Sequence, residues 1–180
     1  MKIDDTQIIW KNFSGRRKIF TKNKNNSTLD FWNPYTSKIA AAIFNGLEIF
    51  PFNENTKIFY LTDNPSDETS LHFSNIIKSN EKIYTKNDKL NLKSHSLDII
   101  FIDKNDDKLI LDSIDELANL LRVDGFLFFS VSLSLKPKKF KNHTNFLIRE
   151  IKQKNFSLIQ EVNLSSYFMD HMLVILQKNE

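Results

Sequence analysis

The stretch that most constrains the fold of this chain is residues 57–70, KIFYLTDNPSDETS. It contains four consecutive apolar residues, 58–61, without the alternation of a strand that has one solvated face. Such a run is typical of a central strand covered on both faces, as in parallel α/β sheets. Asn64, Pro65 and the two acids after them suit the cap and first turn of a helix. The segment therefore predicts a strand, a turn and a helix in a doubly wound α/β domain.

The segments that follow continue this alternation of strands and helices. Apolar runs and helical spacing predict strands at 82–85, 97–103 and 126–133, and helices at 65–79, 106–121 and 140–154, the second ended by Asp124-Gly125. Residues 156–164 and 171–177 predict a closing antiparallel pair. Residues 86–96 are polar almost throughout, so we expect an outer strand and its helix to be deleted there. This plan predicts an α/β fold of the Rossmann-like methyltransferase type.

The N-terminal part of the chain has a different pattern. Residues 7–13 and 17–20 flank Ser14-Gly15 and predict a short β-hairpin, and residues 29–32 predict a third extended piece. Asn33-Pro34 then marks the start of a helix that continues to about residue 47. We therefore expect two parts, a short N-terminal β appendage (1–32) and a Rossmann-like domain (33–180).

Composition and charge narrow the possible functions. The chain has no Cys, which excludes disulfides and thiolate metal sites, and no His, Asp or Glu cluster has metal-ligand spacing. It shows neither a signal peptide nor an apolar run long enough for a membrane, so we expect a soluble, cytoplasmic protein. The 16 Phe are interpreted as core residues rather than base-stacking platforms. The net charge of +3 is modest, but two segments are strongly basic and are interpreted either as an RNA-binding surface or as solvated side chains. The candidate RNA-binding residues are Arg16, Arg17, Lys18, Lys136, Lys138 and Lys139.

Residues 31–43, FWNPYTSKIAAAI, followed by Asn45-Gly46-Leu47 and Phe50-Pro51, closely resemble the fibrillarin family. The corresponding stretch of these RNA 2′-O-methyltransferases of box C/D ribonucleoproteins runs W-[DN]-P-x-x-S-K-L-A-A-A-I. Further matches in order are residues 57–61, 72–76, 82–84, 98–103, 163–164, 167 and 170–171. The resemblance covers roughly residues 8–178, with the N-terminal domain cut short.

The resemblance implies transfer of a methyl group from S-adenosylmethionine to a ribose 2′-hydroxyl selected by a guide RNA. It also implies two kinds of partner, an RNA (guide, rRNA or tRNA) and a Nop-family scaffold protein. Related methyltransferases use a set of four catalytic residues, and Lys38, Asp103 and His171 stand at three of those positions. Ser132 replaces the second lysine of the set and carries neither its charge nor its reach.

The cofactor-binding turn departs further from the family. Its pattern Y-L-G-A-A-S-G-T-T is replaced by residues 60–68, YLTDNPSDE. Glycines at this turn let backbone amides approach the cofactor closely, whereas side chains at these positions prevent that approach and Pro65 removes a donor. The residues left to contact S-adenosylmethionine are Thr62, Asp63, Ser66, Asp67 and, after a one-residue shift, Asp88.

Three functions remain open from the sequence. The first is a degenerate, non-catalytic fibrillarin-like protein that binds RNA or a Nop-family partner and no cofactor. The second is an active RNA 2′-O-methyltransferase that uses S-adenosylmethionine, and the third is a binding domain with a repurposed crevice. Each site residue also has a structural interpretation: Lys38 as a solvated lysine, Asp103 as the cap of a turn, and His171 as a structural histidine.

Overall fold

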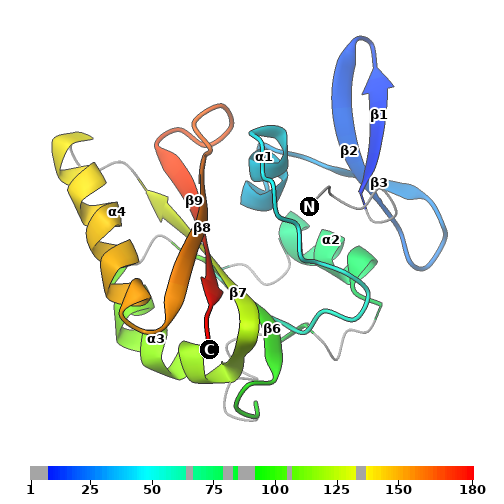
Figure 1. Cartoon of the computed structure of the whole chain (residues 1–180). Coiled ribbons are helices and arrows are strands. Elements are labelled where there is room, and N and C mark those ends of the chain that lie inside the picture. Colours follow the sequence, from blue (N-terminus) through cyan, green and yellow to red (C-terminus); the bar gives the residue numbers. More distant parts are fainter. Residues whose placement is uncertain (1–7, 64–66, 79–82, 85–91, 105–106, 133–136) are drawn as a thin grey trace.

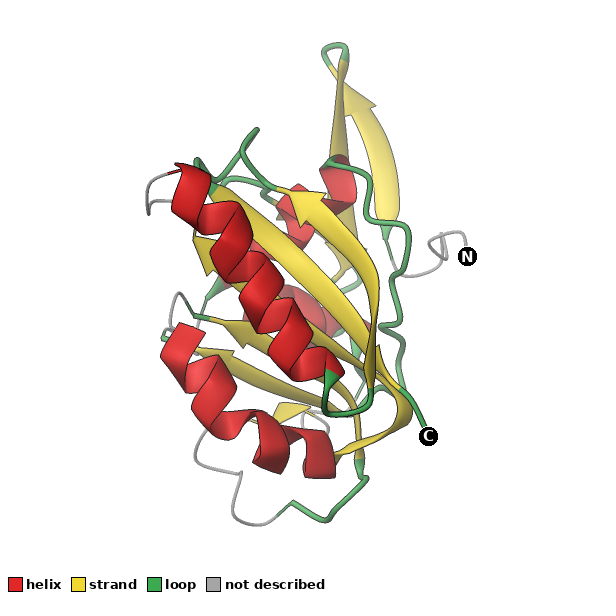
Figure 2. Ribbon diagram, turned by 60° about the vertical axis from the view of Figure 1, so that its left-hand side comes forward, coloured by secondary structure: helices red, strands yellow, loops and turns green. Residues whose placement is uncertain are grey.

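Two β-sheets organise the computed structural model, which describes residues 8–63, 67–78, 83–84, 92–104, 107–132 and 137–180. The small N-terminal sheet is antiparallel and has the order β1-β2-β3. The central sheet has the order β5-β4-β6-β7-β9-β8 and is parallel from β5 to β7, with β9 antiparallel to both of its neighbours (Figures 1 and 2). The strands are β1 (Ile9–Phe13), β2 (Arg16–Lys22), β3 (Leu29–Trp32), β4 (Ile58–Thr62), β5 (Ile83–Tyr84), β6 (Leu97–Asp103), β7 (Leu121–Ser132), β8 (Phe156–Asn163) and β9 (His171–Lys178).

Helices cover the central sheet on both faces. Helices α1 (Lys38–Phe44) and α2 (Glu68–Ile76) share one buried cluster with Ile58, Tyr60 and Phe101. Helices α3 (Asp107–Leu120) and α4 (Pro137–Lys152) share the other cluster with Phe59 and Ile102. Neighbouring strand residues therefore point to opposite faces of the sheet, and helices cover both faces. This confirms the Rossmann-like methyltransferase fold that the unbroken apolar runs predict.

The small sheet packs against the same face as α1 and α2. Ile19 and Trp32 are fully buried in the cluster that contains those helices. The Trp32 ring stacks on His72 of α2 with 4.7 Å between ring centroids. The small sheet and the rest of the chain thus share one buried apolar cluster. The division of the chain into two parts at residue 32 stays a prediction.

Both helices of this face begin later than the sequence pattern predicts. Helix α1 starts at Lys38 with Ser37 as its N-cap, because residues 33–36 form a turn in which the backbone oxygen of Asn33 accepts from the amides of Thr36 and Ser37. Helix α2 starts at Glu68, and its cap is Asp67, whose carboxylate accepts from the Ser70 amide at 2.7 Å. The predicted cap and first position at 64 and 65 lie outside the described residues.

Other boundaries also differ from prediction. Helix α3 ends at Leu120 and β7 begins at the next residue, so Asp124 and Gly125 lie within the strand and do not end the helix. Asp124 has a φ of 61°, and the pairing of β6 with β7 shifts register between Leu97 and Ile99, as it does at a β-bulge. Helix α4 begins at Pro137 rather than at residue 140. The predicted deletion at 86–96 stays a prediction, because residues 85–91 lie outside the described residues; within the described part, β5 is an edge strand.

None of the described helices is both long and apolar enough to cross a membrane. Within the described part of the chain, no group of three or more His, Asp or Glu residues is placed to hold a metal ion. The interpretation of the Phe residues as core is wrong for Phe13, Phe31 and Phe146, whose side chains are exposed.

Candidate functional site

Lys38 is positioned by a buried hydrogen-bond cluster at the start of α1. The hydroxyl of Ser37 caps the helix and also accepts hydrogen bonds from the Trp32 indole at 2.9 Å and from the Thr69 hydroxyl at 2.8 Å. The carboxylate of Glu68 on α2 accepts from the backbone amide of Asn33 at 2.5 Å and from the Thr36 hydroxyl. These contacts fix the first turn of α1 against α2, and the distinctive W-N-P-x-x-S-K run is the sequence signal for that arrangement.

Lys38 and Asp103 form an ion pair, as the resemblance implies for two residues of one site. The ammonium of Lys38 lies 2.7 Å from Oδ1 of Asp103, and the two side chains are only 11% and 13% exposed. Lys38 also donates to the Ser130 hydroxyl at 3.0 Å, and Ser130 donates to Asp103 at 3.3 Å. The pair lies where the carboxyl ends of β6 and β7 meet α1, which is where doubly wound folds bind ligands.

Tyr60 extends this polar network toward the cofactor turn. Its hydroxyl lies 2.6 Å from Oδ2 of Asp67 and 3.3 Å from Oδ2 of Asp103. Burial and the nearby carboxylates of Asp103 and Asp67 raise the pKa of Tyr60 far above its ordinary value. The phenol therefore stays protonated and donates to the nearer acceptor, Asp67. Neither Tyr60 nor Ser130 was identified from the sequence as a site residue.

Asp67 is bonded within the chain through both carboxylate oxygens. Oδ1 accepts from the Ser70 amide, while Oδ2 accepts from Tyr60 and, at 3.1 Å, from the hydroxyl of Thr62. Asp63, the other described acid predicted to contact the cofactor, is 80% exposed and pairs with Lys104. Both acids predicted to contact S-adenosylmethionine at the turn thus have partners already. Ser66 and Asp88 lie outside the described residues.

His171 and Ser132 are register partners at the ends of β9 and β7. Nδ1 of His171 lies 2.7 Å from the backbone oxygen of Met169, and its ring packs edge-on against Phe168. The pair lies two residues beyond Ser130 along β7, toward the same edge of the sheet as Lys38 and Asp103. The structure therefore joins Lys38 with Asp103 directly and places His171 opposite the Ser that replaces the second lysine.

The predicted basic trio of the hairpin is divided between two faces. Alternation along β2 places Arg16 and Lys18 on the outer face of the small sheet, while the Arg17 guanidinium lies on the other face, 4.1 Å from the Trp10 ring centroid. Lys136 and the side chains of Lys138 and Lys139 lie outside what the structure describes. Their convergence with the hairpin stays a prediction.

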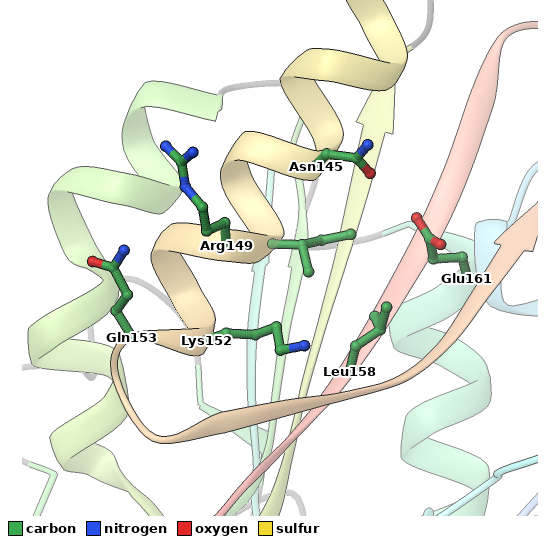
Figure 3. Close-up of a pocket in the computed structure, with 7 residues that line it drawn as sticks. Asn145, Arg149, Lys152, Gln153, Leu158 and Glu161 are labelled. Atoms are coloured by element: carbon green, nitrogen blue, oxygen red, sulfur yellow. The ribbon is translucent and has the colours of Figure 1, made fainter.

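A separate cavity of about 470 Å³ is lined by residues of α4 and β8 (Figure 3). Its lining residue Ile148 belongs to the buried cluster on the face of the central sheet opposite α1, and Leu158 packs against that cluster. Its lining includes Arg149 and Lys152 from the helix and Leu158 and Glu161 from the strand. None of its lining residues belongs to the polar network of Lys38, so the cavity does not extend that site.

Comparison with known proteins relates this arrangement to one family. A model of the Fibrillarin family matches residues 3–95. The chain is similar to the fibrillarin-like rRNA/tRNA 2′-O-methyltransferase of Pyrobaculum aerophilum, with 50% identity over 54 residues, or 30% of this chain and 23% of that protein. It is 25% identical over 178 residues to the Saccharolobus islandicus protein of the same name, covering 80% of this chain and 75% of that one. The first of these matches thus spans less than a quarter of the relative's length.

Three solved structures show the same fold. A Methanococcus jannaschii fibrillarin pre-rRNA processing protein has a TM-score of 0.78 at 18% identity, covering 97% of this chain and 99% of that chain. Aeropyrum pernix fibrillarin, solved with natively bound S-adenosyl-L-methionine, has a TM-score of 0.72 at 16% identity, covering 95% and 99%. A fibrillarin/Nop5p complex has a TM-score of 0.71 at 16% identity, covering 91% and 94%.

Proposed function

The chain belongs to the fibrillarin family, and on that premise we propose that it binds rRNA or tRNA as a component of a ribonucleoprotein. The names of its relatives support the RNA class, because the curated relatives are rRNA/tRNA 2′-O-methyltransferases. The fibrillarin/Nop5p complex supports a Nop-family scaffold as the protein partner, since the fibrillarin in that complex shares this fold.

We further propose that this protein keeps the fold and its binding surfaces but does not transfer methyl groups. The observation that carries this proposal is the internal bonding of Asp67 by Tyr60, Thr62 and the Ser70 amide. A cofactor-binding turn needs small residues and free backbone amides at this position. Here Thr62 stands at the first glycine position, and its hydroxyl bonds within the chain. These contacts of the described turn residues support a turn that does not accept S-adenosylmethionine.

Isothermal titration calorimetry of the full chain with S-adenosylmethionine tests this proposal. We expect no saturable heat at cofactor concentrations up to about 1 mM, which corresponds to less than about 4 kcal/mol of binding free energy. Saturable binding with a micromolar Kd would refute the non-catalytic proposal. The variant Thr62→Gly/Ser66→Gly, which restores both glycines, shows whether the side chains of the turn are the obstacle.

The Lys38–Asp103 ion pair favours a second function, active RNA 2′-O-methyl transfer with S-adenosylmethionine as the donor. A lysine ammonium held 2.7 Å from a carboxylate is a suitable device for orienting a ribose hydroxyl, with the carboxylate beside it as an acceptor for the proton. In that case the wild-type protein methylates a guide-matched RNA, and Lys38→Ala abolishes the activity while the protein remains folded. An assay of wild type and Lys38→Ala with a Nop-family partner and radiolabelled cofactor decides between the two functions.

A further inference from the structure

The outer face of the small N-terminal sheet combines exposed aromatic rings with positive charge. In the register of β1, β2 and β3, alternate residues share this face, and the opposite face packs against α2. The hairpin of β1 and β2 projects away from the central sheet in both views (Figures 1 and 2). The side chains on this outer face that matter here are Lys11, Phe13, Arg16, Lys18, Phe20, Lys22 and Phe31.

Three of these residues form a row of rings. Phe20 lies between Phe13 and Phe31, with centroid separations of 5.7 and 5.6 Å. Phe13 and Phe31 are 47% and 40% exposed, whereas Phe20 is covered by its neighbours. The ammonium of Lys18 lies 5.4 Å from the Phe13 centroid and 5.1 Å from the Phe31 centroid. Two ring surfaces are thus presented to solvent with a cation held between them.

The charge on this face has one sign. Lys11, Arg16, Lys18 and Lys22 are its charged residues in the described strands, and Asp30 of β3 lies on the opposite face, where it accepts from Asn75 of α2. A protein-binding face would be depleted of lysine at its centre. A cationic face with exposed rings instead suits an unpaired polynucleotide, whose phosphates meet the cations and whose bases stack on the rings.

We propose that this aromatic-basic face, defined by Phe13, Phe31 and Lys18 with the flanking Lys11, Arg16 and Lys22, binds a single-stranded segment of RNA by base stacking. The proposal deepens the proposed function and rests on its RNA-binding part. It is independent of cofactor binding. The calorimetric test with S-adenosylmethionine can therefore refute the non-catalytic proposal without affecting this one, and the RNA-binding test below can refute this proposal without affecting that one.

Fluorescence anisotropy with a labelled, unstructured single-stranded RNA of about 12 nucleotides tests the face in the full chain. Stacking contributes about 1–3 kcal/mol per base, so we expect Phe31→Leu, which keeps an apolar side chain but removes the ring, to weaken binding about 5-fold or more. Phe31→Tyr keeps the ring and should bind like wild type. The matched control is Phe146→Leu on α4, because Phe146 is also 40% exposed and has a cation, Arg149, 5.3 Å from its ring. The control should bind within about twofold of wild type.

Lys18 provides an independent measurement. Lys18→Ala should weaken binding and reduce the slope of log affinity against log salt by about 0.7, the value for one phosphate contact on a single strand. Circular dichroism establishes that each variant is folded.

Five outcomes would overturn the proposal, four of them in the RNA titrations. The wild type could fail to bind the RNA, or Phe31→Leu and Phe146→Leu could lose affinity for it equally. Every variant could also bind the single strand with the same affinity, or the wild type could bind duplex RNA as tightly as the single strand. A Phe31→Leu variant that loses a Nop-family partner but retains RNA binding would assign the face to a protein and would also overturn it.

Discussion

The hydroxyl of Tyr60 offers the sharpest test of how the cofactor turn is held. Tyr60→Phe removes one oxygen and keeps a ring that is 2% exposed and stacked on Phe101 at 5.2 Å. The lost hydrogen bond is to the charged carboxylate of Asp67, a class worth about 1.5–3 kcal/mol. Asp67 keeps its bonds from Thr62 and Ser70, so we expect a loss near the lower end, about 1.5–2 kcal/mol.

Urea unfolding followed by tryptophan fluorescence at pH 7 measures this difference. For a chain of this length the same loss should lower Tm by roughly 3–8 °C. The control is Tyr35→Phe, because the Tyr35 side chain is 67% exposed, and it should stay within about 0.5 kcal/mol of wild type. A Tyr60→Phe variant as stable as the control would refute the idea that this hydroxyl holds the turn.

The difference in stability between wild type and Tyr60→Phe should also depend on pH in a definite direction. Burial first, and then the neighbouring carboxylates, raise the pKa of Tyr60 above its ordinary value of 10.0. The folded protein therefore keeps a proton that the unfolded chain loses above pH 10, and this contribution to stability is complete below pH 10 and declines above it, by up to about 1.4 kcal/mol per pH unit. The stability gap between wild type and Tyr60→Phe should narrow between pH 9 and 11. A difference in stability that stays constant over this pH range would contradict the raised pKa of Tyr60 as its cause.

Two further predictions concern buried charge. Lys38→Met leaves Asp103 with the Ser130 hydroxyl as a donor but no cation in a site that is mostly buried, so the free energy of unfolding should fall by about 1–3 kcal/mol in urea titration. No loss would show that the ion pair does not stabilise the fold. Burial lowers the pKa of His72 below 6.5, so its contribution to stability is complete above pH 6.5 and declines as the pH falls. Wild-type stability should therefore drop between pH 7 and 5 more steeply than that of His72→Gln, and parallel curves would exclude His72 as the cause.

The parts of the fold that depend on local apolar pattern were predictable from the sequence. Strands β4 and β6 each contain four consecutive apolar residues, 58–61 and 99–102, that are buried on both faces, so this pattern alone indicates their place in the sheet. Helix starts were less predictable because several residues compete as caps. Asn33 and Ser37 both suit the position, and the turn at residues 33–36 together with the hydrogen bonds from Trp32 and Thr69 favours Ser37.

The candidate site was predictable only where the family pattern reaches it. Lys38 and Asp103 carry the pattern and do meet. Ser130 was not identified, because its role depends on β7 lying beside β6, which brings its hydroxyl to the ion pair. The division of Arg16 and Lys18 from Arg17 follows from strand alternation and was available from the sequence, whereas the exposure of Phe13 and Phe31 was not, since apolar residues on a strand are usually buried.

The order of the central sheet has a consequence for how the protein is made. Strand β9 lies between β7 and β8, although it follows both along the chain. During synthesis the ribosome therefore delivers β7 and β8 before the strand that must join them. Until β9 has left the exit tunnel, the long apolar β7 presents an unpaired edge, which is a template for association with another nascent chain. Any folding intermediate that lacks β9 keeps this edge of β7 unpaired, so docking of the hairpin of β8 and β9 is the step that protects the sheet from association with another chain.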